Sequence, residues 1–330
     1  MKHLDIDTTK AIREISDYLE DLVRRQHTDG VILGLSGGLD SAVLAALAVT
    51  ALGPDRVRVL YLFDRDSDPQ IAQNARLMAQ ILRLPLEEID ITGDMKRRGV
   101  YKPLFPKVLR LSKTVARIST RMFRRICGMS PFMATLRVGR GETLRPWYKQ
   151  ALFDHTIKQL DWGFSQRHLF RRQAIETRAR QQNLSIIGAA NLSECEVGWF
   201  VHGGIDDLPV QPMTGLYKTQ VRQLAAALNL PATVRHQLPS PDMAKGVSDE
   251  FGIGHDYSVI DIVIDALAQG RTAAEIAAEG VEKVEIEDIR RLMELSDWKR
   301  RSPHEVPPVS GAFGSPLRRD ASPPSRRRMA

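Results

Sequence analysis

Two periods of hydrophobic residues run along this chain of 330 residues. Short apolar runs between glycine and polar residues, as in buried parallel strands, occupy residues 30–35, 57–63, 86–91 and 184–188. Longer segments with apolar residues at three- and four-residue spacing predict helices at 8–25, 41–52, 69–82, 174–182, 218–228, 257–268 and 286–299. The alternation predicts an α/β fold, a doubly wound parallel sheet with helices on both faces.

The composition is that of a globular protein in a reducing compartment. Hydrophobic residues make up 43% of the chain and charged residues 26%. The two cysteines, Cys127 and Cys195, form no metal-ligand or disulfide pattern. The start of the chain is polar, and no apolar run reaches the roughly 20 residues of a spanning helix. We therefore expect a cytoplasmic protein.

Positive charge is concentrated in two segments. Residues 95–150 hold 15 Lys and Arg against the single acid Glu142, whereas the chain outside the two segments is net acidic. Residues 301–330 hold six of the 18 prolines and six arginines, which predicts a disordered tail. We expect one domain over residues 1–300, with 95–150 as a basic helical insertion. Aromatic residues do not interleave with its charges, so nucleic acid is not the expected partner.

Part of this insertion has the pattern of an amphipathic basic helix. Val108, Leu111, Val115, Ile118, Met122 and Ile126 recur every three or four residues, offset from Arg110, Lys113, Arg117, Arg121 and Arg124. Three roles are open. The apolar side packs on the core or on a second subunit, or residues 107–126 lie on an anionic membrane surface, or the basic side recognises a polyanionic substrate.

A glycine loop, residues 35–41 (LSGGLDS), lies between a predicted strand and a predicted helix. Gly37 and Gly38 allow a tight turn, so that Ser36, Ser41 and N–H groups at the helix start face an anion. The Gly-Lys-Ser/Thr and GxGxxG patterns are both absent. The acidic Asp40 in such a loop indicates a Mg²⁺ shared with phosphates. The alternative is a serine-capped turn in which Asp40 serves only the helix start.

The loop resembles that of the PP-loop ATP pyrophosphatases, and further motifs narrow the resemblance to the NAD synthase family. These motifs are DRDS at 64–67, GAANLSE at 188–194, GLYKTQV at 215–221, PS at 239–240 with SDE at 248–250, and KRR at 299–301. The resemblance covers about residues 8–308 except the basic insertion. It implies an adenine nucleotide alpha hydrolase-like fold.

The resemblance also implies a reaction and a set of site residues. An acid, deamido-NAD in this family, is adenylated with release of pyrophosphate, and ammonia then displaces AMP to give the amide. ATP and Mg²⁺ would be required, with Asp40, Lys218 and Glu194 catalytic and Asp40 and Glu194 as metal ligands. The implied ATP-binding residues are Gly34, Ser36, Gly37, Gly38, Asp40, Ser41, Lys218 and Ser240.

The acid-binding half departs from the family pattern. Where the family has GDGGADINP this chain reads GGIDDLPVQP at 203–212, which puts Pro209 at a family Asp, and Leu169 falls at a family Arg. The candidates for binding the acid are Arg167, Arg171, Asp206 and Asp207. Two alternatives therefore stay open: amidation of a different carboxylic acid, and a non-catalytic relative that binds adenine nucleotide or membrane.

The resemblance bears on the nitrogen source as well. Family members that use glutamine carry an N-terminal amidase domain with a nucleophilic cysteine. Here about 30 residues precede the first predicted strand, and none of them is a cysteine. Free ammonia, or ammonia from a separate amidase, is implied, and the family resemblance suggests a homodimer.

Overall fold

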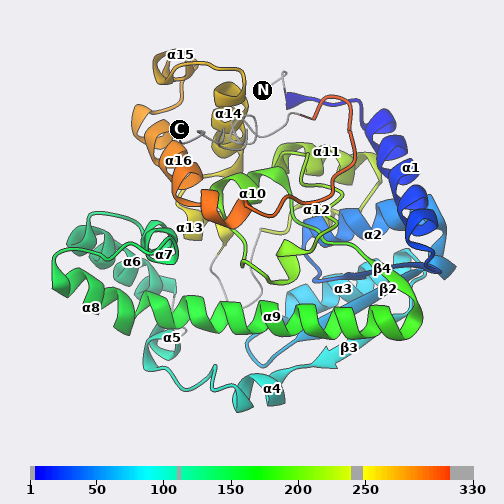
Figure 1. Cartoon of the computed structure of the whole chain (residues 1–330), viewed down its shortest axis with the longest axis horizontal. Coiled ribbons are helices and arrows are strands. Elements are labelled where there is room, and N and C mark those ends of the chain that lie inside the picture. The colour runs from blue at the N-terminus through cyan, green and yellow to red at the C-terminus, as the bar shows by residue number, and fades with distance from the viewer. Residues whose placement is uncertain (1–3, 110–112, 239–247, 313–330) are drawn as a thin grey trace, which may run out of the picture.

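A four-stranded parallel sheet forms the centre of the larger lobe of the computed structural model, which describes residues 4–109, 113–238 and 248–312 (Figure 1). The strand order is β3-β2-β1-β4. The strands are β1 (Gly30–Gly34), β2 (Val57–Phe63), β3 (Leu86–Asp90) and β4 (Leu184–Ile186). All four strands lie within about two residues of their predicted bounds.

The strands are apolar on both faces because helices cover both faces. On one side Val31 and Val59 belong to a core shared with α1 (Thr8–Gln26), α2 (Leu39–Leu52), α3 (Pro69–Ile81) and α11 (Lys218–Ala227). On the other side the alternate residues Ile32 and Leu60 pack with α4 (Thr92–Arg97) and α9 (Ile157–Gln182). The doubly wound α/β prediction is confirmed.

Helix α9 is much longer than the predicted 174–182. Its buried positions include Ile157, Arg167, Arg171, Ile175 and Ala179. Two of these inward positions are arginines, so the apolar periodicity disappears over the first half of the helix. Figure 1 shows α9 crossing the molecule from the insertion to the sheet, with α4 and α5 below it in this view.

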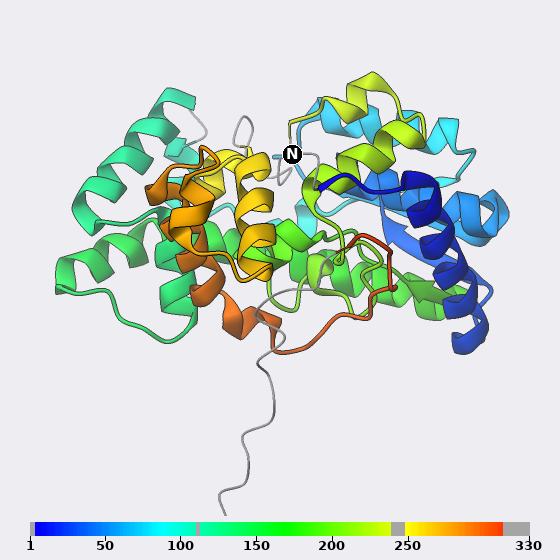
Figure 2. The same cartoon turned by 90° about the horizontal axis from the view of Figure 1, so that it is seen from above.

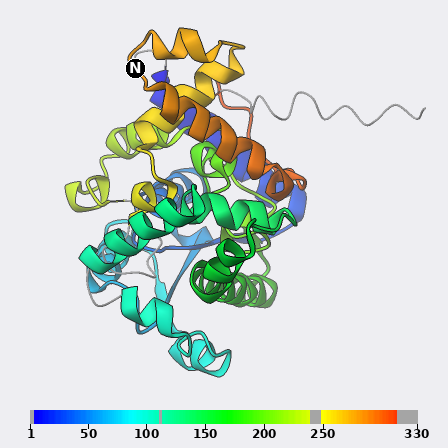
Figure 3. The same ribbon diagram turned by 90° about the vertical axis from the view of Figure 1, so that its left-hand side faces the viewer.

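A second, helical lobe lies beside the sheet lobe (Figures 2 and 3). Its core joins Ile260 and Ile264 to Ile289 and Leu292. The helices of this lobe are α10 (Leu192–Val197), α13 (Asp249–Ile253), α14 (Tyr257–Ala268), α15 (Ala273–Ala277) and α16 (Lys283–Leu295). The predicted helix 286–299 ends at Leu295, and the short turn η4 (Asp297–Arg300) follows. The turns η2 (Pro54–Arg56) and η3 (Ile205–Asp207), with α12 (Ala232–Arg235), complete the elements of the described residues.

The insertion consists of short helices, and the buried face of its central helix is not the apolar stripe described above. It comprises α5 (Leu104–Leu109), α6 (Lys113–Cys127), α7 (Pro131–Gly139) and α8 (Trp147–His155). Ala116, Phe123 and Cys127 of α6 are buried. The predicted apolar stripe is instead open to solvent, with Ile118 49%, Met122 58% and Ile126 40% exposed. Of the open roles, packing on the chain's own core does not hold for these three residues, and packing on a second subunit stays a prediction; the side chains of Val108 and Leu111 lie outside the described residues.

Residues 301–312, the first part of the predicted disordered tail, make defined contacts with the sheet lobe. Residues 301–312 cross back over the sheet lobe, where Glu305 forms a β-bridge with Val210 and Val309 is buried. Both Glu14 carboxylate oxygens accept hydrogen bonds from Ser310, at 2.7 Å from its N–H and 2.5 Å from its hydroxyl. Residues 313–330 lie outside the described residues. Among the helices that the structure describes, none has the length and apolar character needed to cross a membrane.

Candidate active site

A cavity of about 420 Å³ opens at the carboxyl ends of β1 and β4. This is where ligands bind in open parallel sheets. The loop after β1 contributes Ser36, Gly38 and Asp40, and the segment after β4 contributes Gly188 and Glu194. Four elements distant in sequence also line the cavity, namely α6, α7, α9 and α13. The predicted ATP-side and acid-side residues therefore face one space.

The glycine loop is a compact turn held by its two serines. The hydroxyls of Ser36 and Ser41 lie 3.0 Å apart, and the Ser36 N–H donates to the Ser41 hydroxyl at 3.1 Å. Gly37 has φ +84°, and a Cβ there would stand 2.1 Å from the Ile71 carbonyl oxygen. Only glycine fits such a position. The turn leads into α2, whose N-cap is Gly38.

One buried lysine joins the two predicted metal-ligand acids. The Lys218 ammonium lies 2.5 Å from Asp40 Oδ2 and 3.1 Å from Glu194 Oε1. Its side chain is 1% exposed, so the charge depends on these partners. The Tyr257 hydroxyl donates to the same Glu194 oxygen at 3.3 Å. The three predicted catalytic side chains thus form one cluster.

Burial and the lysine act in opposite directions on this cluster. Burial raises the pKa of the Glu194 carboxyl, although Lys218 opposes the shift. Burial also works against the charged form of Lys218, but Asp40 and Glu194 outweigh it and hold the lysine pKa above its ordinary value. The cluster carries two acids for one cation, so a further cation between the acids would relieve their repulsion.

Buried polar groups hold the catalytic side chains in position. The Asn191 side chain caps α10 by accepting from the Glu194 N–H, and its amide donates to Asp40 Oδ1 at 3.0 Å. Asp261 on α14 hydrogen-bonds the Ser193 hydroxyl and accepts from the Thr219 N–H at the start of α11. Packing between α10, α11 and α14 therefore sets where Glu194 and Lys218 meet.

On the acid side, the first candidate cation is already paired. Arg167 donates to Asp64 at 2.6 Å and to Asp66 at 2.7 Å, and Tyr101 also donates to Asp64. Although burial opposes it, the Arg167 charge holds the pKa of Asp64 below its ordinary value. The DRDS segment thus anchors Arg167 of α9. Arg167 and Arg171 both line the cavity.

The two adjacent acids after Ile205 have different surroundings. Asp206 lines the cavity and lies 2.6 Å from Nδ1 of His168. Asp207 is not among the lining residues, and its carboxylate is engaged by His304 and the Gly203 N–H. Leu169 and Pro209, the two departures from the family pattern, are also absent from the lining. The structure thus brings together Arg167, Arg171 and Asp206, but not Asp207.

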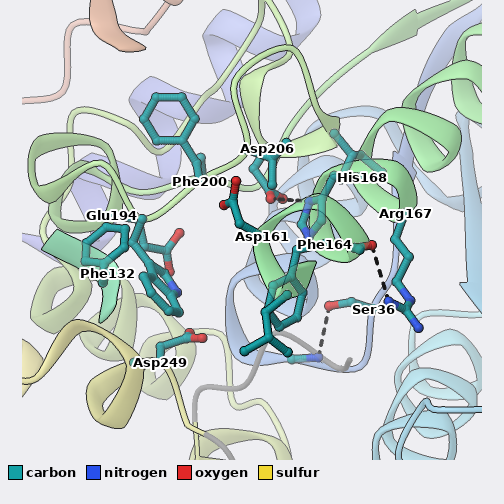
Figure 4. Close-up of a pocket in the computed structure, with 18 of the residues that line it drawn as sticks. Ser36, Phe132, Asp161, Phe164, Arg167, His168, Glu194, Phe200, Asp206 and Asp249 are labelled. Carbon is teal, nitrogen blue, oxygen red and sulfur yellow. Dashed lines mark hydrogen bonds and ion pairs between the residues drawn. The ribbon is translucent and has the colours of Figure 1, made fainter. Parts of the chain in front are cut away.

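Several cavity residues could not be recognised from the sequence. Figure 4 shows Phe132, Asp161, Phe164, Phe200 and Asp249 around the space that also contains Glu194. The Trp199 side chain hydrogen-bonds the Asp249 carboxyl, and burial raises the pKa of Asp249 to about 6 despite the opposing effect of Lys218. The SDE motif was the only signal for Asp249. Asp161 gave none, because it occupies a cavity-facing position on a helix with no clear apolar period.

The predicted ATP-binding residue Ser240 lies outside the described residues. Six of the other residues predicted to bind ATP line the cavity: Gly34, Ser36, Gly38, Asp40, Ser41 and Lys218. Gly37 is not among the lining residues, but its backbone conformation forms the turn. Over residues 4–109, 113–238 and 248–312, no group of three or more His, Cys, Asp and Glu side chains is arranged to hold a metal. Mg²⁺ commonly takes only one or two protein carboxylates together with substrate phosphates, and the pair Asp40 and Glu194 fits that requirement.

Comparison with known proteins gives a consistent family. The sequence model of the NAD synthase family matches residues 11–108 and 150–303. The NH(3)-dependent NAD(+) synthetase of Coprothermobacter proteolyticus is 31% identical over 267 residues, which are 80% of this chain and 86% of that protein.

Two solved structures share the fold. The NMN synthetase from Francisella tularensis superposes with a TM-score of 0.64 at 22% identity, covering 90% of this chain and 97% of that one. For the NH3-dependent NAD synthetase from Campylobacter jejuni the TM-score is 0.59 at 19% identity, with 91% and 99% covered.

Proposed function

Because this chain belongs to the NAD synthase family, we propose that it is an ammonia-dependent ligase that converts the carboxylate of deamido-NAD into the amide of NAD at the expense of ATP. The observation that carries the proposal is the buried cluster of Lys218, Asp40 and Glu194 at the glycine loop. Such a cluster suits a reaction that gathers negative charge on phosphates.

The reaction proceeds in two displacements. A carboxylate oxygen of the acid attacks the α-phosphorus of ATP, the bond to the bridging oxygen breaks, and pyrophosphate leaves. Ammonia then attacks the carbonyl carbon of the acyl-adenylate, loses a proton, and AMP leaves. Lys218 would neutralise charge on the phosphates, while the loop N–H groups and the Ser36 hydroxyl would orient them.

Asp40 and Glu194 would hold a Mg²⁺ ion. The ion would neutralise part of the charge on the phosphate oxygens of ATP. Two observations make these residues suitable: both offer carboxylate oxygens, and the two acids share a single lysine in a buried setting. In the absence of the ion, Lys218 contacts both carboxylates and holds them close together.

The state of the two cysteines favours free ammonia over glutamine as the nitrogen source. Release of ammonia from glutamine needs an accessible cysteine with a lowered pKa. Cys127 and Cys195 are both buried, and burial raises the pKa of Cys127. A separate amidase supplying ammonia is compatible with this arrangement.

A second candidate function is amidation of a different pyridine acid. Pro209 and Leu169 occupy positions at which the family has an Asp and an Arg. The structure from Francisella tularensis that shares the fold is an NMN synthetase. At that level of identity the likeness concerns the fold alone, so the acid has to be determined by experiment.

The test is ATP–pyrophosphate exchange with a panel of carboxylic acids that includes deamido-NAD and nicotinic acid mononucleotide. Exchange reports adenylation without requiring ammonia. We expect the strongest exchange with deamido-NAD. Exchange with the mononucleotide alone would favour the second candidate, and exchange with no acid would contradict both.

We also infer that the protein is a homodimer, as the family resemblance suggests. The exposed stripe of Ile118, Met122 and Ile126 offers apolar surface for a contact outside the chain. Sedimentation at several concentrations tests the dimer, with the triple Ser variant of the stripe as comparison. A monomer that binds vesicles of anionic lipid would favour the membrane alternative instead.

A further inference from the structure

The wall that the insertion contributes to the cavity contains a cation that pairs with no group of the described residues. Arg124 of α6 lines the cavity, and no hydrogen bond or ion pair engages its guanidinium among the described residues. The group lies over the end of α13, where a Cβ added to Gly254 would stand 2.6 Å from Arg124 Nη2. Its charge is therefore available to a ligand in the cavity.

The other cations of the cavity are already engaged. Arg167 is bound by Asp64 and Asp66, and Lys218 by the two acids of the cluster. The Lys299 ammonium donates to the carbonyls of Gly198 and Phe200. Arg171 lies near Asp206 and helps to hold the pKa of that acid low. An anionic ligand would have to compete with protein groups for each of them, but not for Arg124.

The surroundings of Arg124 suit a nucleotide-like acid. Thr120, one turn earlier on the same helix, and its neighbour Ser119 also line the cavity and carry hydroxyl donors. Nearby, Phe132 of α7 meets Trp199 edge to face, with ring centroids 4.8 Å apart. The family match omits residues 109–149, so α6 and α7 belong to the part of this chain that the family pattern does not describe.

We propose that Arg124, with the hydroxyls of Ser119 and Thr120, binds a phosphate group of the acid substrate, and that the insertion thereby completes the acid side of the site. The inference rests on the proposed function and deepens it. A planar guanidinium pairs with two phosphate oxygens at once, and such charge-assisted pairs are the strong ones. Deamido-NAD carries two phosphates, and nicotinic acid mononucleotide carries one.

The experiment compares Arg124→Ala and Arg124→Lys with Arg125→Ala, an exposed neighbour outside the cavity lining. Calorimetry gives the Kd of deamido-NAD in the presence of an unreactive ATP analogue, and steady-state kinetics gives KM for both substrates. We expect Arg124→Ala to weaken deamido-NAD binding roughly 10- to 100-fold. The KM for ATP should stay unchanged, the Lys variant should recover part of the affinity, and Arg125→Ala should match the wild type.

Wild-type affinity in Arg124→Ala would overturn the inference, and so would equal losses for deamido-NAD and ATP, which would mark a structural role. These results are separable from a failure of the proposed function. If the wild type bound deamido-NAD tightly but formed no amide, the proposed function would be contradicted. The Kd of Arg124→Ala would still decide whether Arg124 binds the acid. A wild type that does not bind deamido-NAD at all would overturn the inference too.

Discussion

The two sides of the cavity differ in how their charges are held. On the ATP side, Lys218 is tied to Asp40 and Glu194, and the residues that bear these groups are fixed in turn by Asn191 and Asp261. On the acid side, Arg167 is bound by Asp64 and Asp66, and we propose that Arg124 of the insertion, whose guanidinium makes no hydrogen bond or ion pair with the described residues, also belongs to this side. Family motifs therefore hold both Lys218 and Arg167 in place, whereas Arg124 lies in the insertion, which the family match omits.

The largest effect is expected on the ATP side. Asp40→Asn and Glu194→Gln should each lower ATP cleavage by roughly 10³-fold or more, because preorganised charge at developing negative charge is the dominant catalytic contribution. Both substitutions keep the shape of the side chain, so circular dichroism and thermal unfolding should show an intact fold. AMP release is the measurement, with the exposed Asp55→Asn as control. AMP release near the wild-type rate from either variant would refute the metal-ligand assignment.

The next effect is expected on the stability of the fold, through the buried ion pair between Asp64 and Arg167. Asp64→Asn leaves Arg167 with a weaker partner in a buried site, which should lower the free energy of unfolding by about 3 kcal/mol. The pKa of Asp64 is lower in the folded protein than its ordinary value of 3.8. The ion pair therefore stabilises the protein above that value, and its contribution is lost as the pH falls through the folded pKa.

Urea unfolding of Asp64→Asn and wild type at pH 7 and in acid provides the measurement. The difference between the two should shrink below pH 3.8. A difference that stays constant over the whole range would show that Asp64 stabilises the fold through its shape and not through its charge.

A smaller effect of opposite sign is expected at Asp249. Burial raises its pKa to about 6, so the folded state holds a proton there that the unfolded state releases at lower pH. The cost in stability therefore develops as the pH rises from 3.8 to about 6, and it stays constant above that range. Asp249→Asn should raise the free energy of unfolding by about 1–2 kcal/mol at pH 8, and by little at pH 4.

Unfolding of Asp249→Asn at pH 4 and pH 8 decides this prediction. If Asp249→Asn is more stable than the wild type at pH 8 but has lost turnover, the Asp249 carboxyl serves the reaction at a cost in stability. Destabilisation at pH 8 would instead show that Lys218 needs the Asp249 charge.

The sequence predicted the ATP side far better than the acid side. All four strands and the residues of the cluster were found from apolar runs and ordered motifs, since each depends on a short stretch of chain. The first half of α9 was missed because Arg167 and Arg171 occupy inward positions that normally hold apolar residues. In α6 the apolar periodicity did not identify the buried face. Ala116 and Phe123 are buried, whereas Ile118, Met122 and Ile126 face solvent.

The order of residues 301–312 was also unpredictable from composition. Proline and arginine in the tail suggested disorder, yet pairing of Glu305 with Val210 and of Ser310 with Glu14 depends on residues almost 100 and 300 positions away. Such long-range pairing leaves no local pattern. Asp161 and Arg124 are similar cases, since their place in the cavity follows from the packing of α9 and the insertion.

The most direct test of the proposed reaction is product stoichiometry with the purified chain, ATP, Mg²⁺ and deamido-NAD, supplied with either ammonium chloride or glutamine. We expect NAD, AMP and pyrophosphate in equal amounts with ammonium, and no NAD with glutamine once contaminating ammonia is removed. Release of ADP and phosphate, or NAD formed from glutamine as readily as from ammonium, would contradict the proposed function.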